Sequence, residues 1–314
     1  MTGIGVRKRI WTSVIQLALI VLGGCATVDR AGQYKLYYLG GQSNMEGYGH
    51  VEDLADELRE PVADVMIFTG QAALDNEANA GIGLWQPLQP GHGTGFNSDG
   101  QKNTYSGRFG PELTFGHTLA DLNPGNKVAI VKYSLGGSGL ADGVGYGNWY
   151  PDFEDGGGIN QYDHALTTLR NALGEADIDG DDVPDRLVPS GIVWMQGEAD
   201  AFQSQEAAEA YGSNLKRLMD LLRAALRVDD LPVVIGKITD SGMADDGSVM
   251  DYIETVQDAQ RAFAESDACA AYVTVTDDLP HSDDAWHYQS DGYVAMGEAF
   301  AEAMQQLETD FQAE

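Results

Sequence analysis

A serine near the start of the sequence has the surroundings that nucleophilic catalysis requires. Ser43 lies in the run GGQSNMEG, residues 40–47, directly after a β-rich segment. There its hydroxyl could act as a nucleophile at the edge of a sheet, and its backbone N–H could face an oxyanion. The run is not a Gly-x-Ser-x-Gly elbow, since Asn44 and Met45 follow the serine. A glycine-rich turn with a structural serine is the alternative interpretation.

A carboxylate and a histidine lie close together near the end of the chain. Asp284 and His287 are three residues apart, just before the last predicted helix. In a turn this spacing lets the carboxylate bind the near ring nitrogen, which fixes the tautomer and leaves the other nitrogen free as a general base. A surface ion pair is the alternative. With Ser43, these two residues form the predicted catalytic set.

Two further segments could supply hydrogen-bond donors to an oxyanion. SLGGS, residues 134–138, offers the backbone N–H of Gly136 or Gly137, and WMQGEAD, residues 194–200, offers the side-chain amide of Gln196. Each segment follows a predicted strand, so both should reach the same sheet edge as Ser43, whose N–H is a third donor. Glu198 is expected to order the site through hydrogen bonds.

The elements that must position these residues alternate along the chain. Short, nearly continuous apolar runs predict strands that are buried on both faces, as in a parallel sheet. They are residues 34–39, 65–68, 128–133, 191–195, 231–238 and 271–276. Helical periodicity appears in residues 111–122, 205–228 and 292–311. This alternation predicts a doubly wound α/β domain, with the irregular segments 69–110 and 139–160 over the carboxyl ends of its strands.

The order of the motifs resembles a known group of enzymes. Gly-Gln-Ser-Asn-Met, Gly-Gly-Ser, Trp-Met-Gln-Gly-Glu and Asp-x-x-His follow one another as in the SGNH hydrolase superfamily, and most closely as in its sialate O-acetylesterase and carbohydrate esterase family six branch. Residues 109–113, 231–234 and 256–260 also resemble that branch, although it often has arginine where this chain has Gln257. The similarity spans residues 34 to about 306.

The resemblance implies a fold and a set of roles. The fold would be a single three-layer α/β/α domain with a mainly parallel, flavodoxin-like doubly wound sheet. Ser43 would be the nucleophile, His287 the base and Asp284 its orienting carboxylate. The N–H of Ser43, the N–H of Gly136 or Gly137, and the Gln196 amide would form the oxyanion hole. Gln196 stands where the wider superfamily uses asparagine, and the branch shares this change.

The resemblance also implies an activity. It is that of a serine esterase that removes O-acetyl groups from carbohydrates, such as xylan or sialic acid, through an acyl-serine intermediate and without a required metal or cofactor. A lipase or thioesterase of the same superfamily and a non-catalytic carbohydrate-binding lipoprotein are the alternatives. Trp85, Trp149, Tyr150 and Trp286 lie in or beside the irregular segments, where they could stack on sugar rings or simply pack.

The composition excludes some classes of partner. The 314 residues include 49 acidic and 18 basic side chains, a net charge of −31, and 43% hydrophobic residues. The hydrophobic content is sufficient for a folded core. The charge argues against binding nucleic acid and against electrostatic docking on anionic lipid, and it suits an exported surface in ionic surroundings.

The first residues resemble an export signal. A basic cluster at residues 7–9 precedes an apolar run at 10–22, which ends in Leu-Gly-Gly-Cys at Cys25. This end resembles a bacterial lipobox and predicts a signal peptide over 1–24, a lipidated Cys25 on a tether (25–33), and an esterase domain over 34–314. A short membrane anchor is the alternative. Cleavage would deepen the net charge to −34, and acylation of Cys25 would exclude an intrachain disulfide, because the chain has only two cysteines. The alanine after Cys25 favours the outer membrane if the cell is Gram-negative.

An acidic loop has the spacing of a calcium ligand set. Carboxylates occupy alternating positions in the segment from Asp177 to Asp185, and oxygen ligands of this kind suit calcium. Val188 stands where an EF-hand needs a bidentate glutamate. A structural calcium ion and a solvated loop therefore both remain open.

Overall fold

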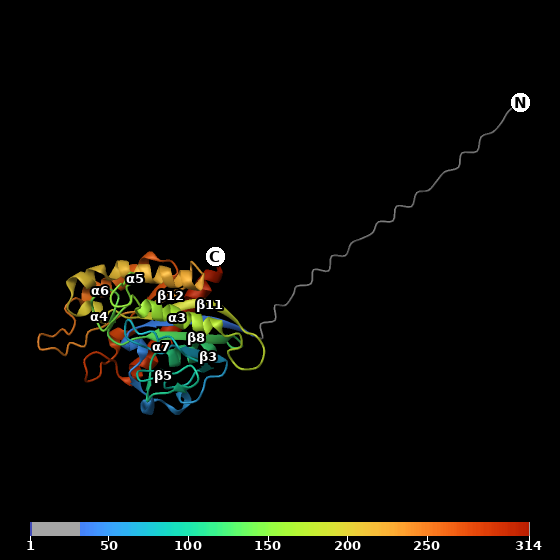
Figure 1. The fold of residues 1–314 in the computed structure, drawn as a ribbon, viewed down its shortest axis with the longest axis horizontal. Helices are drawn as coiled ribbons and strands as arrows, with labels where there is room; N and C mark the ends of the chain where they lie inside the picture. Colours follow the sequence, from blue (N-terminus) through green and yellow to red (C-terminus); the bar gives the residue numbers. More distant parts are fainter. Residues whose placement is uncertain (2–31, 314) are drawn as a thin grey trace. The chain divides into compact units, whose positions relative to one another are not determined.

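The computed structural model describes Met1 and residues 32–313 (Figure 1). The predicted signal segment apart from Met1, the predicted lipid site Cys25 and the tether up to residue 31 lie outside the described residues, so those expectations stay predictions. Within the described part of the chain, no helix is both long enough and apolar enough to cross a membrane.

A seven-stranded sheet forms the centre of the described domain, in the order β13-β12-β11-β1-β8-β3-β4. All neighbouring strands pair in parallel except β4, an edge strand that runs antiparallel to β3. The strands are β1 (Gln33–Gly41), β3 (Val65–Thr69), β4 (Trp85–Pro87), β8 (Lys127–Ser134), β11 (Arg186–Met195), β12 (Val233–Gly236) and β13 (Ala270–Val273). Each predicted strand corresponds to one of the parallel strands, so the prediction of a mainly parallel sheet is confirmed.

Continuous burial explains why the strand sequences do not alternate. Every residue of β3 and of β12 is buried, as is the whole of β8 after Lys127. A strand that is covered on both faces needs apolar side chains at successive positions, and the runs VMIFT and VVIG supply them.

Helices cover both faces of the sheet. α2 (Glu112–Leu122) and α7 (Ser290–Ala313) pack on each other, whereas α5 (Gln205–Leu226) packs on α6 (Ile253–Ser266), and α3 (Gln161–Gly174) contacts β8. From β1 the chain runs out to β3 and the antiparallel β4, returns through α2 to β8 beside β1, and then crosses through α3 to β11, β12 and β13 on the other side of β1. The strand order therefore reverses at β1, as in a doubly wound sheet. The doubly wound, flavodoxin-like prediction is confirmed.

Two helices lack the apolar periodicity that identified the others. α3 begins at a capping box in which the Asn160 side chain accepts N–H bonds and Asp163 bonds back to the N-cap. This signal is present in the sequence, but a glycine-rich loop precedes it. In α6 the buried stripe includes the polar Gln260 between Val256 and Phe263, which interrupts the apolar pattern.

Short elements connect the strands to the site. They are α1 (Ser43–Glu46), β2 (Gly49–His50), η1 (Val51–Asp53), η2 (Asp56–Leu58), β5 (Asn97–Ser98), β6 (Asn103–Thr104), β7 (Arg108–Phe109), β9 (Ser138–Gly139), β10 (Gly147–Asn148), α4 (Glu198–Phe202) and η3 (Val275–Asp278). The irregular segments reach the carboxyl ends of β1 and β8, as predicted: the Thr94 N–H donates to the Gly47 carbonyl (2.9 Å), and the Tyr146 N–H donates to the Gly137 carbonyl (2.7 Å).

Candidate active site

Ser43 lies at the carboxyl end of the central strand. β1 ends at Gly41, and Ser43 is the first residue of α1. Gly41 has φ +149°, and a Cβ built there would lie 2.0 Å from the Met195 carbonyl oxygen. Only glycine allows the ends of β1 and β11 to approach this closely. Ser43 is 6% exposed, so it is held in the core at the point where the strand order reverses, which is the usual ligand site of such sheets.

A buried ion pair supports α1 from below. The Lys132 ammonium donates to Glu112 (2.6 Å) and to the carbonyl oxygens of Glu46 (2.8 Å) and His92 (3.0 Å). Lys132 and Glu112 are both almost fully buried. Each charge of the pair needs its partner, because an isolated charge in the core costs folding free energy. The pair therefore fixes the end of the short helix that carries Ser43.

The glycine turn after β8 lies against the nucleophile. A Cβ built at Gly136 would be 3.5 Å from the Cβ of Ser43. The Gly136 N–H already donates to the Glu46 carboxylate (2.8 Å). Among the described residues, no acceptor is found for the N–H of Ser43 or of Gly137. Of the predicted backbone donors, those of Ser43 and Gly137 are therefore open to an oxyanion, and that of Gly136 is occupied.

The Gln196 amide is occupied as well. Its nitrogen donates to Asp200 (2.7 Å), to the Ser138 carbonyl (3.1 Å) and to Gln42 (3.3 Å). Asp200 is fully buried and needs such donors; burial raises its pKa to about 6, against the hydrogen bonds from Leu140 and Gln196. In this arrangement the amide of Gln196 donates to Asp200 and is not free for the predicted hydrogen bond to an oxyanion.

Asp284 and His287 form the predicted pair. The Nδ1 of His287 lies 2.7 Å from one oxygen of Asp284, whose other oxygen accepts the N–H groups of Trp286 (2.9 Å) and His287 (3.0 Å). Partial burial opposes ionisation of Asp284, but these hydrogen bonds outweigh it and lower its pKa to about 2. The Tyr48 ring stacks on the imidazole, with centroids 3.6 Å apart. The pair leaves Nε2 as the nitrogen that can exchange a proton.

Asn44 connects the serine to the histidine. Its amide nitrogen donates to the Trp286 carbonyl (3.1 Å) and to Glu198 (2.7 Å), while its oxygen accepts the Tyr293 hydroxyl (2.8 Å). The residues beside Ser43 and beside His287 are thus bonded to each other. Within the described chain, no hydrogen bond joins the Ser43 hydroxyl directly to the His287 ring.

Glu198 has the ordering position that the sequence predicts. One carboxylate oxygen accepts the Asn44 amide, and the other has no partner among the described residues. Full burial raises the pKa of Glu198, and the Asn44 hydrogen bond opposes that shift. Glu198 therefore acts here as a fixed acceptor for Asn44.

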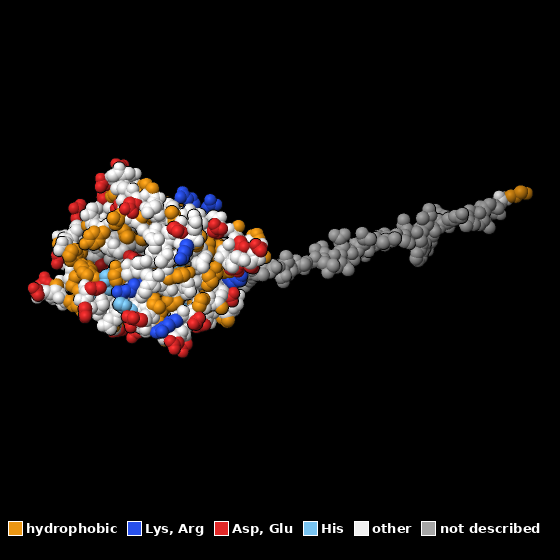
Figure 2. Space-filling view, turned by 60° about the horizontal axis from the view of Figure 1, so that its bottom comes forward, with side chains coloured by type: hydrophobic (Ala, Val, Ile, Leu, Met, Phe, Trp, Pro, Cys, Tyr) orange, Lys and Arg blue, Asp and Glu red, His pale blue; other side chains and the backbone are white. Residues whose placement is uncertain are grey.

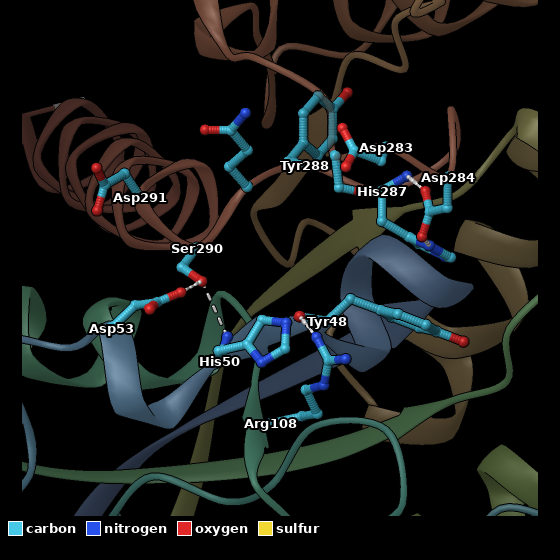
Figure 3. A pocket seen from close by; sticks show the side chains of 12 residues that line it. Tyr48, His50, Asp53, Arg108, Asp283, Asp284, His287, Tyr288, Ser290 and Asp291 are labelled. Atoms are coloured by element: carbon cyan, nitrogen blue, oxygen red, sulfur yellow. Dashed lines mark hydrogen bonds and ion pairs between the residues drawn. The ribbon is translucent and has the colours of Figure 1, made fainter.

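A cavity of about 740 Å³ opens on the histidine side of the site (Figure 3). It is polar, and His287 and Asp284 belong to its wall, whereas Ser43 does not. Its lining residues are Tyr48, His50, Asp53, Arg108, Ser282, Asp283, Asp284, His287, Tyr288, Gln289, Ser290 and Asp291. The cavity therefore lies beside the proposed base.

Two of the four aromatic residues singled out in the sequence have the packing role that the sequence left open. Trp149 is fully buried and donates to Ser138 (2.8 Å), and Trp85 is buried and donates to the Ala172 carbonyl (3.0 Å), so both are packing residues. Sequence reasoning missed Tyr146, which is 81% exposed and lies over Gly137, where an added Cβ would meet its ring at 2.5 Å. The signal was an aromatic residue between two glycines in an irregular segment.

The predicted calcium loop brings its carboxylates together. Ligand oxygens of Asp177, Asp179 and Asp185 lie within 4.8 Å of one another, a spacing that can hold a cation. Asp179 also accepts the Lys127 ammonium (2.8 Å) and the Tyr34 hydroxyl (2.7 Å). The Lys127 hydrogen bond lowers the Asp179 pKa. The loop is thus already partly neutralised by the protein.

Known proteins resemble this chain in sequence and in fold. A probable carbohydrate esterase of Arabidopsis thaliana is 30% identical over 112 residues, which is 36% of this chain and 38% of that protein. The matched stretch thus spans well under half of that relative. A solved Arabidopsis thaliana structure has a TM-score of 0.59 at 20% identity and covers 88% of this chain and 98% of its own. A carbohydrate acetylesterase of Xanthomonas citri has a TM-score of 0.60 at 15% identity, covering 88% of this chain and 56% of its own.

Both solved structures share the α/β fold with this chain. At 20% and 15% sequence identity, this similarity establishes the fold alone. The model of the family described as "Carbohydrate esterase, sialic acid-specific acetylesterase" matches residues 33–306, which is most of the chain. The motifs on which the resemblance rests all lie inside that match. The chain therefore belongs to the carbohydrate esterase family of sialic acid-specific acetylesterases.

Proposed function

We propose that this protein is a serine esterase that removes O-acetyl groups from carbohydrates. The observation that carries the proposal is the Asp284–His287 pair at 2.7 Å, joined to the segment of Ser43 by the hydrogen bond from Asn44 to the Trp286 carbonyl. A carboxylate-oriented imidazole next to a serine is the arrangement of acyl-transfer enzymes on unrelated folds. Membership of a carbohydrate esterase family supports the same reaction.

The residues take the following roles in the proposed reaction. Ser43 Oγ attacks the acetyl carbonyl, and Nε2 of His287 accepts the serine proton while Asp284 stabilises the imidazolium. The N–H groups of Ser43 and Gly137 stabilise the tetrahedral oxyanion. The sugar hydroxyl leaves with the proton from His287, and water then releases acetate from the acyl-serine. The proposed reaction requires Ser43 Oγ to reach Nε2, and in the described structure no hydrogen bond holds the Ser43 hydroxyl away from it.

The surroundings of the site favour a sugar over a long acyl chain. The cavity beside His287 is lined mainly by polar and charged side chains, whereas a lipase needs an apolar channel for its acyl group. The exposed ring of Tyr146 offers a flat apolar surface of the kind that packs against sugar rings. A lipase or thioesterase is therefore the weaker candidate.

Acetate release from a panel of acetylated glycans tests the proposal. We expect release by the wild-type protein, none by Ser43→Ala, and a preference for p-nitrophenyl acetate over p-nitrophenyl laurate. A preference for laurate would favour the lipase alternative. Binding of glycan by both forms without hydrolysis by either would favour the non-catalytic alternative.

We further propose that the protein is exported and anchored through a lipid on Cys25. The support is the basic cluster, apolar run and Leu-Gly-Gly-Cys end of the first residues. Labelling of cells with a palmitate analogue should mark the wild-type protein and not Cys25→Ser. Equal labelling of both forms would contradict the anchor.

We keep calcium as a proposed structural brace of the Asp177–Asp185 loop. The support is the convergence of three carboxylates, whose mutual repulsion the Lys127 ammonium offsets only in part. Calcium should raise the melting temperature of the wild-type protein over that in chelator by a few degrees at most, because the ion would relieve only local repulsion. Asp177→Asn should abolish that difference, and an unchanged wild-type melting temperature would contradict the proposal.

A further inference from the structure

The cavity beside His287 carries an excess of negative charge. Four carboxylates line it, those of Asp53, Asp283, Asp284 and Asp291, against the single guanidinium of Arg108. Asp284 is paired with His287. Among the described residues, none of the other three carboxylates has an ion-pair partner. A ligand that enters this cavity therefore meets a field that is mainly negative.

The one cation in the wall is already engaged. Arg108 donates from its guanidinium to the Tyr48 carbonyl, and Tyr48 in turn stacks on His287. In the view of Figure 3, Arg108 and His50 lie on one side of the cavity and Asp283 and Tyr288 on the other. Arg108 thus positions the Tyr48 segment, and it does not neutralise the opposite wall.

The remaining polar groups of the cavity can form hydrogen bonds with the hydroxyl groups of a sugar. Ser290 donates to Asp53 (2.6 Å) and accepts the His50 N–H (2.9 Å). Asp283 and Asp291 keep free acceptor oxygens, since no hydrogen bond to their side chains is found in the described structure. Carboxylates accept hydrogen bonds from sugar hydroxyls but repel a ligand carboxylate.

The surface of the whole molecule adds to this effect. The formal net charge is −31, and Figure 2 shows acidic side chains spread widely over the face in view, with few basic ones between them. A field of this sign lowers the local concentration of anionic ligands around the protein.

We propose that this site selects acetylated sugars without a negative charge and discriminates against acidic sugars such as sialic acid. The inference rests on the proposed esterase function and narrows its substrate class. It departs from the description of the family model, which names sialic acid. The discriminating residues are Asp53, Asp283 and Asp291.

A pair of substrates that differ by one charge and one methyl group tests the inference. An O-acetylated sialic acid and its methyl ester present the same acetyl group on the same ring, and acetate itself is measured. At low salt we expect kcat/KM for the methyl ester to exceed that for the free acid by about 10-fold or more. Added salt should narrow the gap, because it screens the repulsion.

Matched variants show whether the cavity carboxylates or the net charge of the protein cause the discrimination. Asp53→Asn with Asp291→Asn should raise hydrolysis of the free acid relative to the ester, since asparagine keeps an acceptor but removes the charge. Asp229→Asn with Asp230→Asn makes the same change of net charge at exposed residues of the turn before β12 and should leave the ratio unchanged. If both double variants raise the ratio equally, the net charge and not the cavity discriminates, and the inference is wrong.

Two other results would overturn it. Free acid hydrolysed as well as the ester, with a selective loss in Arg108→Gln, would identify Arg108 as a carboxylate-binding residue. Hydrolysis of p-nitrophenyl acetate with release from neither the methyl ester nor any neutral member of the acetylated glycan panel would show that uncharged acetylated sugars are not accepted. Failure of the wild-type protein to hydrolyse p-nitrophenyl acetate would instead contradict the proposed esterase function.

Discussion

The serine and the histidine of the proposed site stand on parts of the molecule that are built differently. Ser43 is 6% exposed, at the end of a strand buried between two others, on a helix whose last carbonyl is bonded by the buried Lys132. The His287 turn is more open, and the side chain of Asp284 is 49% exposed. The turn is held by the Asp284 bonds, by the stacked Tyr48 ring and by Asn44. The position of His287 relative to Ser43 therefore depends on the few contacts that hold the His287 turn.

Removing the base should have the largest effect. We expect His287→Ala to lower kcat for p-nitrophenyl acetate by on the order of 10⁴–10⁶, because serine and base act as a unit. Ser43→Ala should cost about as much, and the double variant no more than either single one. Additive losses in the double variant would show that the two residues do not act together.

Removing the charge of the orienting carboxylate should cost somewhat less. Asp284→Asn keeps the turn but can present an N–H to Nδ1, which favours the wrong tautomer, so kcat should fall on the order of 10⁴. A loss of less than tenfold would contradict the role of Asp284 in orienting the imidazole.

The same variant tests the turn through pH. The folded-state pKa of Asp284 is lowered from 3.8 to about 2, so its ionised form stabilises the fold at pH values above its unfolded-state pKa. That contribution is lost as the pH falls through about 2. Asp284→Asn should therefore melt below the wild-type protein at pH 6, and the difference should shrink toward zero near pH 2. A difference that does not depend on pH would contradict the ionised pair.

Cutting the link between the two parts should have an intermediate effect. Asn44→Ala leaves Glu198, the Trp286 carbonyl and the Tyr293 hydroxyl without their shared partner. We expect a loss of about 1–3 kcal/mol in the free energy of unfolding and about 10–100-fold in kcat from misplacement of the turn.

Tyr293→Phe is the matched control for Asn44→Ala, because it removes the bond to the amide oxygen but keeps the Asn44 bonds to Glu198 and the Trp286 carbonyl. It should lower stability while kcat changes little. Equal losses of kcat in both variants would show that Asn44 supports the fold and does not align the site.

Removing the exposed ring should have the smallest effect. Tyr146→Ala should raise KM for an acetylated glycan by about 2–10-fold, as expected for a lost ring contact of about 0.5–1.5 kcal/mol. Tyr146→Phe should retain the wild-type KM, and p-nitrophenyl acetate hydrolysis should not change. A higher KM for both substrates would indicate a general disturbance of the Gly137 turn.

Local patterns predicted the parts of the site that are close in sequence. The β-rich run before Ser43 and the three-residue spacing of Asp284 and His287 need only neighbouring residues, and the structure brings each together as expected. The parallel sheet followed from continuous apolar runs, because burial on both faces leaves that signature in any single strand.

Contacts between distant segments left no such signature. The Gly136 N–H is taken by Glu46, 90 residues away, and Asn44 bonds to the carbonyl of Trp286, 242 residues away. Gln196 was expected to face the oxyanion, but the buried carboxylate of Asp200 competes for its amide. The packing of the whole fold decides which donor is free. The order of the motifs along the chain carries no information about that packing.

Chemical trapping of the nucleophile tests the proposed reaction most directly. A p-nitrophenyl phosphonate forms a stable adduct with an activated serine, and mass spectrometry of the digested protein locates it. We predict one adduct, on Ser43, formed in step with loss of activity and absent in His287→Ala. An adduct on another residue, or full inactivation without modification of Ser43, would contradict the assignment of Ser43 as the nucleophile.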